Sequence, residues 1–319
     1  FFTHTRQYAI ASCLVGSEMC IRDRFITYEK LMRDVNKENI SDVFMSYLGA
    51  DVNPRLREVM QSLVNHLHAF AKDINLTHEE WNKGIEILER SGEISDEKRH
   101  EFILLSDVLG LSSLVDMINS KDGGTSSSVL GPFHISGAPD LKIGGDLKGD
   151  FGGQLLLAQG IIKNSKGIPI KDAKVDIWQT APNGLYSSQD PNQDTYSFHG
   201  LQTTGADGRY AFTTAKPIEY TVPSDGPVGK ILNACGRHPW RPSHLHFIIK
   251  AEGYQTLVTE IFSEDDPYLD QDTVFGVRED LVMKYKEMAP DSFPPGFELS
   301  GSINENYLRV DFDLTLVSI

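Results

Sequence analysis

The hydrophobic pattern of this 319-residue chain changes its period once, at a segment rich in glycine and serine. Upstream of that segment, apolar residues recur at spacings of three and four, which is typical of an amphipathic helix. One such face consists of Leu56, Val59, Met60, Leu63, Val64, Leu67 and Ile74. The segment 121–128, KDGGTSSS, ends this pattern, because clustered glycine and serine favour a loop. Two regions of different secondary structure are therefore predicted.

Two further signals support helices before the change of period. Thr77 followed by Glu80 is a capping-box signature for a helix that begins there. Phe102, Leu105 and Leu109 indicate another helix. From about residue 26 to residue 119 the chain is thus expected to be helical.

After the change, short runs with a high β-propensity alternate with turn signals. The runs are 160–163, 175–178, 210–213, 245–250 and 257–262, and residues 308–316 alternate like a final strand. Pro182-Asn183-Gly184 and Asp207-Gly208 are turn signals between them. The predicted fold class is α+β, mostly β, with an N-terminal helical region and a C-terminal antiparallel β-sandwich.

Three segments are predicted along the chain. Residues 1–24 lack the order of a signal peptide, and CLVGSEMCIRDR (13–24) resembles translated sequencing-adaptor text. We treat them as a leader that is not native, with a degenerate export signal as the alternative. Residues 25–122 would form the helical domain and residues 123–319 the β-sandwich domain.

Composition excludes several classes of partner. The chain has 45 acidic and 30 basic residues, a net charge of −15, which argues against nucleic acid and anionic membranes. It has no apolar run of the ~18–20 residues that span a bilayer. Its three cysteines have no disulfide-framework spacing, so a reducing cytoplasm is the simplest location.

The stretch 237–247, RHPWRPSHLHF, places two histidines one residue apart. In a strand, alternate side chains point to the same face, so His244 and His246 would point together and Leu245 away from them. This geometry suits two metal ligands, but it equally suits two histidines on a solvated face. Arg241 is a fixed cation close to them in the sequence.

Two tyrosines upstream follow or lie between turn residues. Tyr186 follows the glycine turn in NGLYSSQD, and Tyr220 lies between prolines in PIEYTVPSDGP. With His244 and His246 they would make a hard, anionic donor set that suits trivalent iron better than zinc. The alternative is that both tyrosines are structural, with hydroxyls bonded to the backbone. The residue types alone favour the structural alternative over a metal site.

Together these motifs resemble the intradiol ring-cleavage dioxygenases, non-haem ferric enzymes that open catechols between the two hydroxyl-bearing carbons. The resemblance rests on LGPF (130–133), GLY (184–186), EYTVP (219–223) and RPSHLHF (241–247), in that order, and extends from about residue 26 to the C-terminus. The stretches 101–116, 225–247 and 267–277 are most similar to members that act on hydroxyquinol (benzene-1,2,4-triol).

The resemblance implies a role for each matching residue. Tyr186, Tyr220, His244 and His246 would bind one Fe(III) per subunit, and Tyr220 would leave the metal when substrate arrives. Arg241 would stabilise negative charge on the substrate ring, which makes it catalytic together with Tyr220. The positions that match the substrate pocket are Leu104, Asp107, Val129, Leu130, Gly131, Pro132, Phe133, Val222, Pro223, Arg241 and Glu260.

Two of these residues bear on specificity. A buried carboxylate at Asp107 could accept a hydrogen bond from a third ring hydroxyl, or the residue could merely end a helix near Gly110. Glu260 departs from the family pattern, and it could be protonated, paired with Arg241 or turned away.

The implied reaction converts hydroxyquinol and O2 to 3-hydroxy-cis,cis-muconate, the enol form of maleylacetate. Catechol or chlorocatechol is the alternative substrate. A homodimer through the N-terminal helices, with phospholipid between them, is also implied. A non-catalytic, transthyretin-like binding module is the alternative of another class, since 160–180 resembles such folds.

Overall fold

The computed structural model describes residues 33–96, 99–299 and 303–319, so the predicted leader 1–24 lies outside the described residues. The chain divides into two compact units after Lys83. The predicted bounds 25–122 and 123–319 stay a prediction. No helix among the described residues is long and apolar enough to cross a membrane.

The first unit is helical. It contains α2 (Ile40–Ser46), α3 (Pro54–Asp73) and the start of α4 (His78–Ile94). Asn53 caps α3, because its side-chain oxygen accepts hydrogen bonds from the backbone N–H groups of Arg55 and Leu56. The predicted capping box is confirmed: Glu80 accepts from the Thr77 backbone, and the Glu80 N–H donates to the Thr77 hydroxyl.

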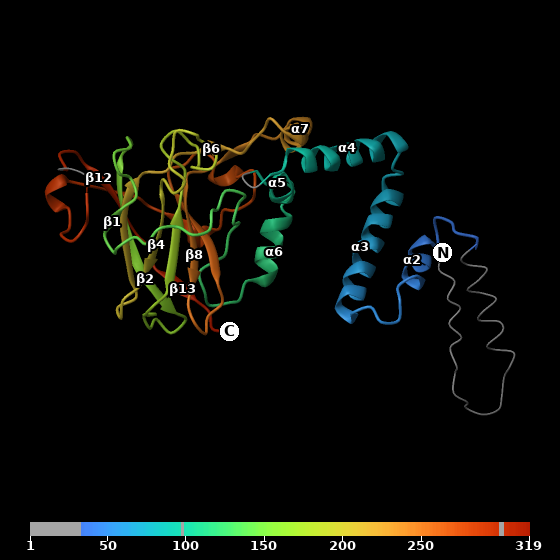
Figure 1. Cartoon of the computed structure of the whole chain (residues 1–319), viewed down its shortest axis with the longest axis horizontal. Helices are drawn as coiled ribbons and strands as arrows, with labels where there is room; N and C mark the ends of the chain where they lie inside the picture. The colour runs from blue at the N-terminus through green and yellow to red at the C-terminus, as the bar shows by residue number, and fades with distance from the viewer. Residues whose placement is uncertain (1–32, 97–98, 300–302) are drawn as a thin grey trace, which may run out of the picture. The chain divides into compact units, whose positions relative to one another are not determined.

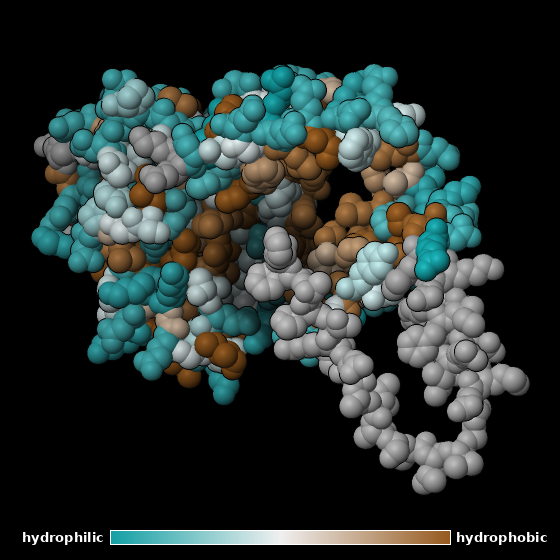
Figure 2. Space-filling model, turned by 45° about the vertical axis from the view of Figure 1, so that its right-hand side comes forward, coloured by the Kyte–Doolittle hydropathy of each residue, from teal (hydrophilic) through white to brown (hydrophobic). Residues whose placement is uncertain are grey.

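Much of the apolar face of α3 remains exposed. Leu56, Leu63, Leu67 and Phe70 each expose at least half of their surface, and Figure 2 shows hydrophobic residues on the surface of the N-terminal helices. Val64 is the buried residue of this helix. An apolar stripe of this size is uncommon on the surface of a monomer.

The second unit begins with helices and ends with the sandwich. Where the sequence suggested one helix, the structure has α5 (Glu101–Val108) and α6 (Leu111–Asn119). Gly110 separates them, because its left-handed backbone (φ 75°) is open to glycine and interrupts the helical hydrogen bonds. These helices lie with α7 (Pro227–Ala234) at one side of the strands (Figure 1).

The expected β-sandwich is confirmed. One sheet has the order β1-β5-β2-β12-β11 with β13 also on β2, the second has the order β10-β9-β8-β3-β4, and β6 pairs with β7. The strands are β1 (Gly145–Asp146), β2 (Leu155–Asn164), β3 (Lys174–Trp178), β4 (His199–Thr203), β5 (Arg209–Ala215), β6 (Tyr220–Thr221), β7 (Trp240–Arg241), β8 (His244–Lys250), β9 (Leu257–Ser263), β10 (Val282–Met283), β11 (Lys286–Met288), β12 (Tyr307–Asp311) and β13 (Leu314–Leu316). Short 3-10 helices are η1 (Leu269–Gln271), η2 (Glu279–Leu281) and η3 (Pro290–Ser292).

The pairing is not purely antiparallel. β3, β8 and β9 pair antiparallel, but β12 and β13 both run parallel to β2. The predicted final strand 308–316 is two strands, because the Asp313 carboxylate replaces a backbone acceptor and takes the hydrogen bond of the Ile161 N–H. The ladder on β2 resumes at the Leu314–Ile162 pair in the same register.

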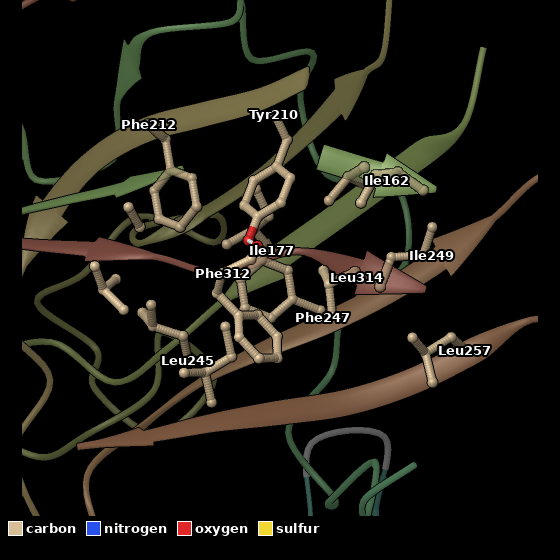
Figure 3. Close-up of a cluster of buried hydrophobic side chains, with 14 of the residues drawn as sticks. Ile162, Ile177, Tyr210, Phe212, Leu245, Phe247, Ile249, Leu257, Phe312 and Leu314 are labelled. Atoms are coloured by element: carbon tan, nitrogen blue, oxygen red, sulfur yellow. Dashed lines mark hydrogen bonds between the residues drawn. The ribbon is translucent and has the colours of Figure 1, made fainter. Parts of the chain in front are cut away.

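The core fills the space between the two sheets. Leu245, Phe247 and Ile249 of β8 project into it, where Phe247 meets Tyr210 and Phe212 of the opposite sheet (Figure 3). The intervening residues of β8 necessarily point to the outer face of the five-stranded sheet. The sandwich thus fixes which residues can form a site on that face.

We predict that Leu245→Ala lowers the free energy of unfolding in urea by about 3 kcal/mol, because it opens a cavity in a fully buried position. Leu114→Ala is the control, since Leu114 is 48% exposed. A loss no larger than that of the control would contradict this account of the core.

Candidate active site

Four side chains converge on the outer face of the five-stranded sheet. The Tyr186 hydroxyl lies 3.2 Å from the Tyr220 hydroxyl, 3.3 Å from His244 Nε2 and 2.8 Å from His246 Nε2. The two Nε2 atoms are 3.0 Å apart. All four residues are at most 5% exposed. Oxygen and nitrogen atoms at such spacings can share one cation at about 2 Å from each.

Local backbone structure brings these four residues together. His244 and His246 stand on one face of β8, as the sequence predicted, and Leu245 packs in the core. Tyr186 follows a tight turn in which the Gly184 N–H donates to the Ala181 carbonyl. Tyr220 is opposite Arg241 in the β6–β7 pair. The metal-ligand roles of these residues stay a prediction.

The remaining ring nitrogens have different surroundings. His244 Nδ1 lies 2.7 Å from the Pro242 carbonyl, which fixes its Nε2 toward the site. His246 Nδ1 is buried without a hydrogen-bond partner among the described residues, and the Glu260 carboxylate is 3.3 Å away. A carbonyl or carboxylate behind each imidazole is the usual arrangement around histidines that bind metals.

Burial controls the protonation of the four donors. It raises the pKa of both phenols, well above the ordinary value for Tyr186, where the neighbouring Tyr220 adds to the effect. It also lowers the pKa of His244 and, more strongly, of His246. Neutral imidazoles are ready to bind a metal, while phenolates in this site require a strong cation beside them. The donor set therefore fits a trivalent ion.

Arg241 is buried between two carboxylates. Its guanidinium donates two hydrogen bonds of 2.9 Å to Glu260 and two of 3.0 and 3.1 Å to Asp272. Burial alone would lower the pKa of Arg241, but these carboxylates raise it well above its ordinary value. Of the three possibilities for Glu260, the structure shows the ion pair. Burial would raise the pKa of Glu260, but Arg241 holds it below its ordinary value.

Comparison with known proteins gives the family. The model described as "Dioxygenase" matches residues 131–317, and "Catechol dioxygenase N terminus" matches residues 53–125. The chain belongs to the intradiol catechol dioxygenase family. It is therefore an enzyme of intradiol ring cleavage. Members of this family use non-haem Fe(III), and the family implies an aromatic substrate. The alternative of a non-catalytic module is wrong.

Three relatives show how far the similarity extends. The chain is 46% identical to hydroxyquinol 1,2-dioxygenase of Rhizobium sp. (strain MTP-10005), covering 83% of this chain and 90% of that protein. It is 44% identical to 6-chlorohydroxyquinol 1,2-dioxygenase of Cupriavidus pinatubonensis, covering 89% and 99%. The solved structure of hydroxyquinol 1,2-dioxygenase from Pseudomonas putida DLL-E4 superposes with a TM-score of 0.79 at 40% identity, covering 89% and 99%.

The residues predicted to line the dioxygenase's substrate pocket differ in exposure. Leu104, Val129 and Val222 belong to one buried cluster, and Asp107, three residues after Leu104 on α5, is 2% exposed. A side-chain atom at Gly131 would lie 3.8 Å from the His246 ring, so the backbone passes close to the site there. Phe133 stacks on Tyr186, Pro132 and Pro223 are partly buried, and Leu130 is 42% exposed.

A cavity opens beside these residues. Its volume is about 650 Å³, and Pro132, Phe133, His134 and Gln189 are among its lining residues. Among the residues that line it, Pro132 and Phe133 belong to the predicted substrate pocket, and none is one of the four donors.

Sequence reasoning missed three residues around the ion pairs, namely Ser128, Asp272 and Gly276. Ser128 donates to both Glu260 and the Gly276 carbonyl, and the Gly276 N–H donates to Asp272. In the sequence, the stretch 267–277 contributed only to the family resemblance and did not predict a site residue. Its acidic residues and glycine were the available signal, but no local pattern links them to Arg241.

A second cluster joins two histidines to one carboxylate. His134 and His199 bond to different oxygens of Asp176, at 3.0 and 2.7 Å. Burial opposes ionisation of Asp176, but these two hydrogen bonds lower its pKa to about 2. Trp178 lies between this cluster and His246, on which it stacks with ring centroids 4.5 Å apart.

Asp107 should make stability depend on pH. Burial raises its pKa to about 6, whereas an ordinary aspartate titrates near 3.8. The folded chain therefore binds this proton more tightly, and the resulting stability is complete below about pH 4 and lost as pH rises through about 6. Asp107→Asn should match the wild type at pH 4 in urea unfolding, and exceed it by about 2–3 kcal/mol at pH 7.5.

Asp140→Asn, at an exposed position, is the control and should show no such divergence. An equal difference between Asp107→Asn and the wild type at both pH values would contradict the assignment.

Proposed function

We propose that this enzyme is a hydroxyquinol 1,2-dioxygenase. The ring of benzene-1,2,4-triol would be opened between the two adjacent hydroxyl-bearing carbons. Both atoms of O2 enter the product, 3-hydroxy-cis,cis-muconate, which tautomerises to maleylacetate. The single observation that carries the choice of substrate is the buried carboxyl of Asp107 near the site.

The surroundings of Asp107 favour a substrate that carries a third hydroxyl on its ring. It is 2% exposed on a helix whose neighbours Leu104 and Val108 are buried, and the charges of Arg241 and Glu260 both act on its pKa. Ser112 is one hydrogen-bond partner of this carboxyl. A third ring hydroxyl would offer it a second, so a ring that carries this hydroxyl would bind better than catechol, which has none there. The similar dioxygenases of Rhizobium sp. and Pseudomonas putida DLL-E4 act on hydroxyquinol, and that of Cupriavidus pinatubonensis on 6-chlorohydroxyquinol, so all three support a substrate of this type.

The proposed metal is one Fe(III) per chain, held by Tyr186, Tyr220, His244 and His246. When bound, it would make the coordinated substrate ring reactive toward O2. The four residues fit this ion because burial keeps both imidazoles neutral, and because two phenolates would offset part of its charge.

Tyr220 and Arg241 are proposed to act on the substrate. A catechol must lose two protons before it binds as a dianion, and Tyr220, released from the metal, would accept one of them as it becomes a phenol. Arg241 cannot give up its proton, so it would stabilise negative charge on the ring without acting as an acid. Tyr220 and Arg241 are opposite each other in the β6–β7 pair, which supports their joint action.

Oxygen uptake with hydroxyquinol and with catechol tests the choice of substrate. The wild type should have the higher kcat/KM with hydroxyquinol, and Asp107→Leu should reduce that preference by about 10-fold or more, because the apolar side chain has no bond to offer the third hydroxyl. Asp116→Leu, a change at another acidic residue with a raised pKa, should keep the preference. A wild-type preference for catechol or chlorocatechol would overturn the proposal.

We also infer a homodimer formed through the N-terminal helices. The carrying observation is the apolar face of α3, where Leu63 is 50% exposed and Leu67 is 55% exposed. A second copy of this face, with acyl chains of phospholipid filling gaps, would remove it from water. The cytoplasmic location expected from the cysteine spacing stays a prediction.

Sedimentation should report a dimer for the wild type and a monomer for the double variant Leu63→Asp, Leu67→Asp, because two charges cannot be buried in an apolar interface. The control is His66→Asp, at an exposed residue between them. A monomeric wild type, or a double variant that remains dimeric, would contradict the inference.

A further inference from the structure

Glu260 contacts two groups with different proposed roles. It lies on β9 opposite His246 of β8, and its side chain is fully buried. One of its neighbours is Arg241, on the proposed substrate side, and the other is His246, on the proposed metal side. The charge of Glu260 can therefore influence both Arg241 and His246.

The two oxygens of Glu260 have distinct surroundings. Oε2 accepts hydrogen bonds from the Ser128 hydroxyl at 2.6 Å and from Arg241 Nη2 at 2.9 Å. Oε1 accepts from Arg241 Nη1 at 2.9 Å, and it lies 3.3 Å from His246 Nδ1 and 3.4 Å from His244 Nε2. Ser128 and Arg241 thus hold the carboxylate so that Oε1 remains beside the imidazole.

His246 Nδ1 needs such a partner. An imidazole that binds a metal through Nε2 carries its proton on Nδ1, and a buried N–H without an acceptor is costly. His244 Nδ1 has the Pro242 carbonyl, but His246 Nδ1 has no hydrogen-bond partner among the described residues. The nearest ionised acceptor is Oε1 of Glu260.

We propose that Glu260 is a positioning residue that couples Arg241 to His246, and that its carboxylate sets how strongly the His246 imidazole donates to the metal. This inference rests on the proposed ferric site. A carboxylate behind a ligand imidazole makes the ring more basic, and therefore the iron a weaker Lewis acid. Arg241 is bound to the same carboxylate. A substrate whose negative charge attracts Arg241 would therefore weaken the Arg241–Glu260 ion pair and so alter the charge that Glu260 presents to His246.

Asp272 provides a matched comparison. It accepts two hydrogen bonds from Arg241, of nearly the same length as the two that Glu260 accepts. No contact between Asp272 and His246 is found in the described part of the chain. Gly276 makes room for both carboxylates: a side-chain atom there would lie 2.7 Å from Arg241, 2.7 Å from Glu260 and 3.0 Å from Asp272. Loss of either carboxylate disturbs Arg241, whose Nη1 lies 3.2 Å from His244 Nε2, but Glu260 is the one of the two that also lies beside His246.

The test compares the iron-loaded full-length variants Glu260→Gln and Asp272→Asn. Visible absorption by charge transfer from tyrosinate to iron reports Lewis acidity, and a more acidic iron absorbs at longer wavelength. Glu260→Gln should shift the band to longer wavelength and weaken iron binding by about 10- to 100-fold in chelator competition. Asp272→Asn should shift the band less than Glu260→Gln does, because Asp272 reaches the imidazoles through Arg241, which lies 3.2 Å from His244 Nε2. Both variants should raise KM through Arg241.

A band at the wild-type position in Glu260→Gln, or an equal shift in Asp272→Asn, would overturn the coupling. If Glu260→Gln does not fold, Glu260→Asp carries the test, because the shorter carboxylate keeps its charge but retreats from Nδ1 and should shift the band in the same direction. An iron-loaded wild type without any band would instead overturn the ferric site itself, and this inference with it.

Discussion

The two-residue period of β8 is the constraint on which the site depends. Leu245, Phe247 and Ile249 are committed to the core between the sheets, and this fixes the register of the strand. His244 and His246 are consequently held on the opposite face, where neighbouring strands bring Trp178 and Glu260 beside His246. A slip of one residue would exchange the core and site faces, so the stability of the sandwich also protects the geometry of the site.

Charge compensation is the second constraint. The site buries one guanidinium and two carboxylates, and each would be costly alone. Arg241 is hydrogen-bonded to both Glu260 and Asp272, and the remaining acceptor capacity is used by Ser128 and by backbone N–H groups. The assembly has a net negative charge before the phenols are counted. A trivalent cation beside it therefore meets favourable electrostatics as well as suitable ligands.

Several strands, one helix start and the candidate donors could be predicted from the sequence, because short local patterns encode them. Short runs of high β-propensity between turn signals located β3, β5, β8 and β9, and the capping residues Thr77 and Glu80 located a helix start. The four candidate donors were found because each lies in a short motif with turn or strand signals. Glu260 was found only as a departure from the family pattern, and its partner could not be chosen.

The remainder required long-range information. The break at Gly110 depends on the conformation of one glycine, and the break before Leu314 depends on Asp313 meeting a strand about 150 positions away. Asp272 and Gly276 join Arg241 only after a loop folds back across the sheet, which no periodicity encodes. Local patterns therefore gave the candidate donors, the family resemblance gave their predicted roles, and tertiary structure showed which residues surround them.

The central claim is that Tyr186, Tyr220, His244 and His246 hold one ferric ion. The most direct measurement is the visible spectrum of the purified chain after iron loading, with iron content determined on the same sample. The account predicts one iron per chain and an intense tyrosinate-to-iron absorption band that is weakened in both Tyr186→Phe and Tyr220→Phe. A colourless protein at full iron content, or a band that survives unchanged in both variants, would contradict it.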